Sequence, residues 1–262
     1  MKTLHRFLAP SVAIAGALLA AAITTRAAVS VQTLPTHAMR ARVALHHDIF
    51  SRDGERVGDV YDYVLQFTSP PQLRYVIVKT GGVAGVGGEE RAIPADAVTF
   101  AGNRFEVNLT HAAFGQLPVL PQHRRTFFDN AANLTDLAKR CGTPAQHAAL
   151  AEGYVLFSHL SNDDVMVGTN SEDLGHFRDI WIDFNANEAP YLEFVATSEE
   201  LVLRGDVSFD IPTTKIIRLE SNRIYFATSE DEIANAKSVT DVVAYVAKAG
   251  DELEILQQKV VR

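Results

Sequence analysis

The chain has 262 residues, of which 47% are hydrophobic and 21% charged, a balance typical of a folded protein and not of a disordered one. Its formal net charge of −8 argues against nucleic acid as the main partner, because phosphate binding needs clustered Lys and Arg. The single cysteine, Cys141, excludes an internal disulfide, so the fold must be held by apolar cores alone.

The N-terminus predicts export. A basic segment, Lys2 to Arg6, precedes an apolar run from Phe7 to Ile23, and small residues follow as far as Ala28. We expect residues 1–28 to be a secretory signal peptide, with an uncleaved inner-membrane anchor as the alternative. In both cases the folded part would lie outside the cytoplasm, which in a bacterium is the periplasm. The chain would contact the membrane only if the run stays uncleaved.

The next segment predicts a small β domain. After a polar tether over residues 29–40, short β-branched and aromatic runs alternate with turn residues at spacings near ten. A glycine-rich connection occupies residues 81–88. The spacing favours a small barrel or sandwich over residues 41–118. The expected strands cover residues 41–50, 57–67, 73–78, 91–100 and 104–109.

The same pattern returns about 117 residues later, with an offset that drifts only to 119. This steady register predicts a second, divergent domain over residues 153–230. The matching segments are Gly54–Leu65 with Ser171–Ile182, Arg74–Val78 with Tyr191–Val195, Ala92–Pro94 with Asp210–Pro212, and Asn103–Val107 with Asn222–Phe226.

Two segments have no counterpart in the repeat. Residues 119–152 predict a partly helical connector, with one helix over Asn133–Cys141 that ends at Gly142 and a second piece over Pro144–Ala151. Residues 231–262 carry apolar side chains at a spacing of three to four, which predicts an amphipathic helix. That helix would either pack on its own domains or form a homodimer contact. The candidate interaction residues of both segments are Phe127, Phe128, Val242, Val246, Leu253 and Leu256.

Residues 45–109 resemble the PRC-barrel family. The resemblance is carried by the Gly54–Leu65 stretch, by Tyr75–Val78 running into the glycine-rich turn, and by Ala92-Ile93-Pro94. It implies a mainly β fold: two small antiparallel PRC-barrel-like β-barrels, a partly helical connector and a C-terminal helix. The second domain keeps parts of the signature but lacks the glycine turn. The signature residues are Gly54, Gly58, Asp62, Gly81, Gly82, Gly85, Gly87, Pro94, Gly175, Asp179 and Pro212.

No pattern predicts catalysis, a cofactor or a metal. The glycine-rich loop runs into Glu89-Glu90, which would repel phosphate, so a turn explains it better. His46 and His47 would point to opposite faces of a strand and could not share one ion. Asp62 persists as Asp179, and a retained aspartate beside a strand is expected to accept backbone hydrogen bonds.

The sequence therefore predicts an exported, non-catalytic protein. The resemblance implies a protein-interaction or envelope scaffolding and assembly module, and family analogy extends this to a stress-related setting. Two alternatives stay open. One is a module that binds a small ligand or metal between the barrels, and the other is a membrane-tethered assembly factor. The protein partner itself is not predicted.

Overall fold

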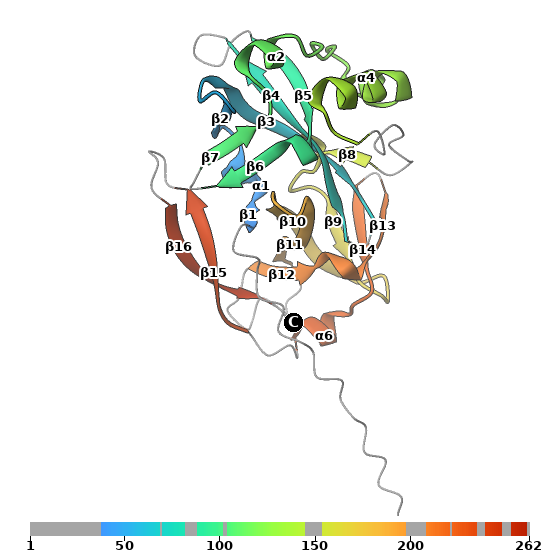
Figure 1. Cartoon of the computed structure of the whole chain (residues 1–262). Coiled ribbons are helices and arrows are strands. Elements are labelled where there is room, and N and C mark those ends of the chain that lie inside the picture. Colours follow the sequence, from blue (N-terminus) through green and yellow to red (C-terminus); the bar gives the residue numbers. More distant parts are fainter. Residues whose placement is uncertain are drawn as a thin grey trace, which may run out of the picture. The chain divides into compact units, whose positions relative to one another are not determined.

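The fold is described from a computed structural model, shown in Figure 1. The description covers residues 38–68, 70–81, 88–101, 104–144, 154–197, 208–220, 222–234, 239–247 and 253–260.

The first half of the fold, residues 48–115, contains six strands. Its elements are β2 (Asp48–Ser51), β3 (Arg56–Gln66), β4 (Gln72–Thr80), β5 (Glu89–Pro94), the 3₁₀ turn η1 (Ala95–Ala97), β6 (Val98–Ala101), β7 (Arg104–Val107) and α2 (His111–Gly115). Strands β2 to β5 pair antiparallel in chain order. After η1, β6 and β7 form a hairpin, and β7 returns parallel to β2.

The second half, residues 165–234, repeats this order of pairing. Its elements are β9 (Val165–Val167), β10 (Asp173–Asp183), β11 (Glu188–Ala196), β12 (Ser208–Pro212), η4 (Thr213–Lys215), β13 (Ile216–Glu220), β14 (Arg223–Phe226) and α6 (Glu230–Ala234). Strands β9 to β12 pair antiparallel, β13 pairs with β14, and β14 lies parallel to β9. The sheet is therefore mixed, where the sequence predicts antiparallel barrels. In each half the first and last strands are far apart in sequence and pair in parallel, which a long connection between them permits.

Each half is completed by a short segment from outside it. β1 (Ala38–Arg40) pairs with β10 of the second half, and α1 (Ala41–Ala44) follows it. β8 (Tyr154–Leu156) pairs with β3 of the first half and leads into η3 (Phe157–His159). Figure 1 shows β1 beside β10 and β8 beside β3. We call β1–α1 and β8–η3 the crossing segments.

The two halves also join edge to edge. Glu188 of β11 pairs with Gln72 of β4, which makes the two sets of strands one continuous sheet. The backbone contacts are reciprocal, since Leu73 N–H donates to Asn187 O at 2.9 Å and Ala189 N–H donates to Pro71 O at 2.8 Å. These donors and acceptors are related by an offset of 116 residues.

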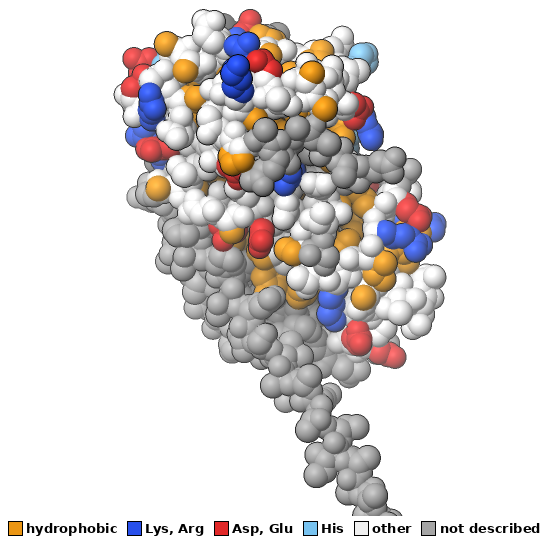
Figure 2. Space-filling model, turned by 45° about the vertical axis from the view of Figure 1, so that its right-hand side comes forward, with side chains coloured by type: hydrophobic (Ala, Val, Ile, Leu, Met, Phe, Trp, Pro, Cys, Tyr) orange, Lys and Arg blue, Asp and Glu red, His pale blue; other side chains and the backbone are white. Residues whose placement is uncertain are grey.

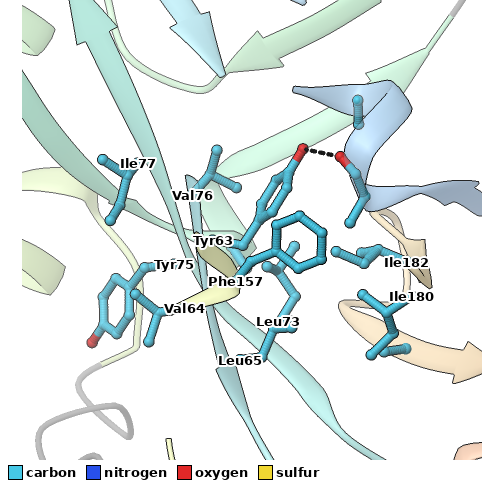
Figure 3. Packing of buried hydrophobic residues seen from close by; sticks show 14 of the residues in the cluster. Tyr63, Val64, Leu65, Leu73, Tyr75, Val76, Ile77, Phe157, Ile180 and Ile182 are labelled. Carbon is cyan, nitrogen blue, oxygen red and sulfur yellow. Dashed lines mark hydrogen bonds between the residues drawn. The ribbon is translucent and has the colours of Figure 1, made fainter. Parts of the chain in front are cut away.

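The apolar core runs through both halves. Tyr63 of β3 packs edge-on against Phe157 of η3, with ring centroids 5.7 Å apart, beside Ile180 and Ile182 of β10 (Figure 3). The Tyr63 hydroxyl donates to Ala41 O of the other crossing segment at 3.3 Å. Since Tyr63 is fully buried, separating the crossing segments from the sheet would expose its ring to water.

The connector contains α3 (Arg124–Phe128) and α4 (Ala131–Cys141). The predicted helix over Asn133–Cys141 is confirmed, and Gly142 ends it in the left-handed conformation that glycine tolerates. Asn130 caps the start by accepting from Ala132 N–H. The predicted second piece lies outside the described residues after Pro144.

Two other predictions are wrong. Residues 38–40 of the predicted tether form β1, with Ala38 and Met39 buried, because their apolar side chains complete the second half. The predicted strand over residues 41–50 begins as helix α1, and only its end is β2. Ala41 and Ala44 are fully buried there, and their small side chains permit the close approach of α1 to the core.

The predicted C-terminal helix is also wrong. After α6 the chain forms an antiparallel hairpin of β15 (Val239–Ala247) and β16 (Leu253–Val260). Val242 and Val246 therefore lie on β15, and Leu253 and Leu256 on β16. The segment is rich in β-branched residues, which lose side-chain freedom in a helix and suit a strand. The described part of the segment therefore offers no helix for the predicted dimer contact.

Candidate functional site

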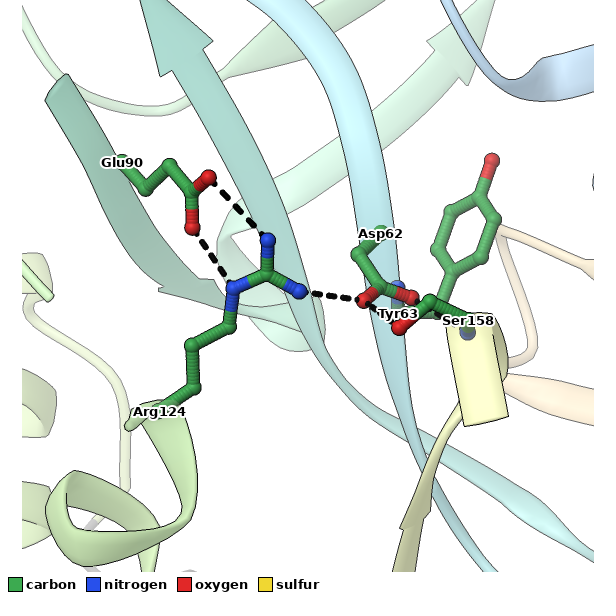
Figure 4. A network of polar contacts seen from close by, with 5 residues as sticks. All are labelled: Asp62, Tyr63, Glu90, Arg124 and Ser158. Atoms are coloured by element: carbon green, nitrogen blue, oxygen red, sulfur yellow. Dashed lines mark hydrogen bonds and ion pairs between the residues drawn. The ribbon is translucent and has the colours of Figure 1, made fainter. Parts of the chain in front are cut away.

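Asp62 is the centre of a polar network that ties a crossing segment and the connector to β3 (Figure 4). Its Oδ1 accepts from Tyr63 N–H at 2.8 Å and from Ser158 N–H at 2.9 Å. Its Oδ2 accepts from Ser158 Oγ–H at 2.5 Å and from Arg124 Nη1 at 2.8 Å. Arg124 reaches Glu90 of β5 with two further bonds. The Asp62 carboxylate is 1% exposed and all of its acceptor capacity is used internally.

Asp179 occupies the equivalent place in the second half. Its Oδ1 accepts from Ile180 N–H at 2.8 Å and from Arg42 N–H at 3.2 Å, and Arg42 belongs to crossing segment β1–α1. Asp62 makes the same pair of bonds with its own next residue and with Ser158 of the other crossing segment. The prediction that the retained aspartates accept backbone hydrogen bonds is confirmed. Each aspartate therefore fixes a crossing segment onto a long strand.

A row of three buried acids distinguishes the second half. Asp179 on β10 is opposite Glu193 on β11, and Glu193 is opposite Asp210 on β12. Their exposed fractions are 3%, 1% and 0%. We call these three residues the acid row. Arg40 Nε of β1 lies 3.0 Å from Glu193 Oε2, and Arg178 Nε lies 3.5 Å from Glu193 Oε1.

Trp181 closes the acid row on one side. Its indole Nε1–H donates to Asp210 Oδ1 at 2.9 Å, and the Arg40 guanidinium carbon lies 5.2 Å from its ring centroid. Asp210 Oδ2 accepts no hydrogen bond within the described part of the chain. Such an orphaned buried oxygen is costly unless it carries a proton.

Apart from Asp62, which corresponds to Asp179, the first half is apolar at the corresponding positions. Glu193 pairs with Asp210 across β11 and β12, and Ile77 pairs with Ala92 across the equivalent strands β4 and β5. Glu193 therefore corresponds to Ile77, and Asp210 to Ala92. Trp181 likewise corresponds to Val64, and Arg40 to Leu156. The polar residues of the second half thus replace an apolar cluster as a set.

Burial changes the acidity of two members of the acid row. Loss of water around Asp210, with the neighbouring Glu193 charge, raises its pKa to about 7. Burial, with the same neighbour, raises the pKa of Asp179 to about 6. Asp210 therefore titrates near neutral pH.

The signature glycines and prolines shape the strands. Gly58 and Gly175 occupy equivalent sites with φ of +156° and +144°, and a Cβ at either would collide with the carbonyl of Lys79 or Val195 on the neighbouring strand. Pro94 and Pro212 lead equally into η1 and η4. Gly54 and Gly81 also have positive φ. The remaining signature residues, Gly82, Gly85 and Gly87, lie outside the described residues.

Phe127 and Phe128 do not form an interaction surface. They are 6% and 1% exposed, and Phe128 packs 5.4 Å from Tyr75 of β4, measured between ring centroids. The connector needs these rings to cover the first half, which explains the difference from the prediction. Cys141 of α4 is also buried, and burial raises the pKa of its thiol to about 12, so the thiol stays protonated.

Within the described ranges, no three His, Cys, Asp or Glu side chains are grouped so as to hold a metal ion. His46 lies in a turn with φ of +68° and not in a strand. Among the same residues, no helix has the length and apolar character needed to cross a membrane. The face of the molecule in Figure 2 carries basic and acidic side chains interspersed.

Comparison with known proteins supports one part of this description. The family model of the PRC-barrel domain matches residues 45–113, from just before β2 into α2. The resemblance of the first half is therefore confirmed. No curated protein matches the chain.

The sequence reasoning missed the acid row. It aligned Glu193 with Val76, whereas strand pairing aligns it with Ile77, an offset of 116 and not 117. One sequence feature could have revealed it. Ala92-Ile93-Pro94 returns as Asp210-Ile211-Pro212, so an acid replaces alanine in an otherwise identical strand end.

Proposed function

We propose that this protein is an exported, non-catalytic binding module in which two PRC-barrel-like halves form one rigid scaffold for a protein partner. The observation that carries the proposal is the repeated use of Asp62 and Asp179 as internal clamps. The carboxylate that persists in both halves holds a crossing segment in place and does not face solvent.

The second half as a divergent copy of the PRC barrel is part of this proposal. It is supported by the identical order of strand pairing, by the equivalent glycines Gly58 and Gly175, and by helices α2 and α6 at matching positions. The resemblance to the PRC-barrel family implies that such barrels dock on larger protein partners. A scaffold of this kind would offer two different surfaces on one fold, since the second half has lost much of the signature.

The exposed apolar side chains supply a test of partner binding. Val119, beside β5, is 47% exposed, and Ile217, on β13, is 58% exposed. A photo-crosslinking amino acid would replace one of them at a time in the full-length chain in its native cell, with the exposed Thr135 of α4 as the control position.

We expect a discrete protein adduct from Val119 or Ile217 and none from Thr135. Two further results would contradict the proposal. One is the absence of any protein adduct from both positions. The other is turnover of a substrate by the purified chain. Export is tested separately by sequencing the N-terminus of the mature protein, where a start near Val29 is expected and retention of Met1 would favour the anchor.

A further inference from the structure

The acid row has more carboxylate oxygens than donors to satisfy them. Asp210 Oδ1 accepts from Trp181, but Asp210 Oδ2 accepts from no described group. The facing Glu193 is ion-paired with Arg40 through Oε2 and with Arg178 through Oε1. Like charges directly opposite on neighbouring strands repel each other. A proton on Asp210 would remove that repulsion and give its free oxygen a hydrogen to donate to Glu193.

We propose that the acid row binds one proton, and that this proton governs how tightly the crossing segment β1–α1 is held on the second half. The proton belongs to the three carboxyls as a set, because neighbouring acids titrate together. Asp210 is its main site, since the Asp179 carboxylate already accepts two backbone hydrogen bonds.

The charged and titratable groups that face the row change its affinity for this proton. Glu193 disfavours the second negative charge, whereas Arg40 favours it. Burial outweighs both and holds the pKa of Asp210 near 7. Among the side chains that the structure describes, the facing groups are Arg40 on β1, Arg42 on α1, Tyr63 on β3, Arg178 and Asp179 on β10, Tyr191 and Glu193 on β11, and Asp210 on β12. The β15–β16 hairpin also contacts β1 and β12.

The direction of the coupling follows from which state buries the acids. β1 places Arg40 over Trp181 and beside Glu193, so its departure would admit water to the row. Hydrated carboxyls titrate near 3.8, well below the pKa of the buried Asp210. The closed state therefore binds the proton more tightly, and lowering the pH favours closure. With a pKa of about 7 for the closed state, closure should be about tenfold more favourable at pH 6 than at pH 8.

The only tryptophan in the chain is Trp181, so its fluorescence reports directly on the row. We would titrate the full-length protein from pH 5 to pH 9 and expect one transition with its midpoint near 7. Asp210→Asn should abolish the transition, because the amide supplies a permanent donor of the same shape. Asp59→Asn, an exposed acid of the first half, is the matched control and should leave it unchanged.

Two further variants keep the proposal testable if Asp210→Asn does not fold. Glu193→Gln removes a like charge and should lower the midpoint, while Arg40→Gln removes a cation and should raise it, each by about one pH unit. Absence of a transition would overturn the proposal. So would a midpoint unchanged in Asp210→Asn, or equal in the Glu193 and Arg40 variants.

Hydrogen exchange tests the coupling to β1. After correction for intrinsic rates, the β1 amides of the wild type should be about tenfold more protected at pH 6 than at pH 8. In Asp210→Asn the protection should be equal at the two pH values. Equal protection in the wild type would show that the proton does not govern closure.

Discussion

Replacing Asp62 by Ala should remove the clamp between β3, the connector and crossing segment β8–η3. The substitution deletes four hydrogen bonds, including the Arg124 ion pair, and leaves the N–H group of Tyr63 buried and that of Ser158 part-buried, both without this acceptor. Each orphaned buried N–H costs about 1–3 kcal/mol. Arg124 keeps its two bonds to Glu90, so losing Asp62 does not leave its charge unpaired, and this loss adds less than the cost of a fully buried pair broken from one side. We therefore expect the free energy of unfolding to fall by about 2–4 kcal/mol, a large part of the total for a typical domain.

The assay is urea unfolding at pH 7, followed by Trp181 fluorescence and by far-ultraviolet circular dichroism. Asp59→Ala is the control, because Asp59 is on the same strand and its ion pair with Arg56 is solvent-exposed. That loss should be about 0–1 kcal/mol. Asp62→Asn keeps an acceptor for both N–H groups and should fall between the two. A loss for Asp62→Ala no larger than for Asp59→Ala would refute the clamp.

Three other perturbations have expected outcomes. Gly175→Ala should cost about 2–4 kcal/mol in urea unfolding, since its Cβ collides with the β11 backbone, whereas Gly115→Ala has open space and should stabilise by about 0.5–1 kcal/mol. Phe128→Ala should cost about 3–5 kcal/mol, and a cost below 1 kcal/mol would contradict its place in the core. Because the pKa of Asp210 is about 7 in the folded state and 3.8 when its carboxyl is hydrated, the folded state binds more protons between these values. The contribution of Asp210 to the free energy of unfolding, measured as wild type minus Asp210→Asn, should therefore decrease as the pH rises from about 4 to about 7, and an increase would be the opposite result.

Local signals in the sequence were sufficient for part of the fold. Helix α4 and its end at Gly142 follow from apolar spacing and a left-handed cap, which depend on neighbours in the chain. The long strands β3 and β10 follow from a repeated pattern, and the role of Asp62 and Asp179 follows from its persistence in both.

Contacts between distant segments could not be predicted in this way. The sequence does not show that β1 completes the second half while β8 completes the first, because pairing between strands 88 to 145 residues apart leaves no local pattern. For the same reason the sequence does not predict the burial of Glu193, because Arg40 and the strands that cover it are distant in the chain. At the C-terminus, a spacing of three to four competed with β-branched composition, and the strand preference prevailed.

The central claim is that the crossing segments make the two halves one cooperative scaffold, and two single probes test it directly. Trp181 lies in the second half, and Cys141, the only cysteine, is buried in α4 of the connector beside the first. Urea unfolding would be followed by Trp181 fluorescence and by pulsed thiol labelling of Cys141 in the same samples. Coincident midpoints are predicted. Labelling of Cys141 at a urea concentration where Trp181 remains native would show that the halves unfold separately and would contradict the account.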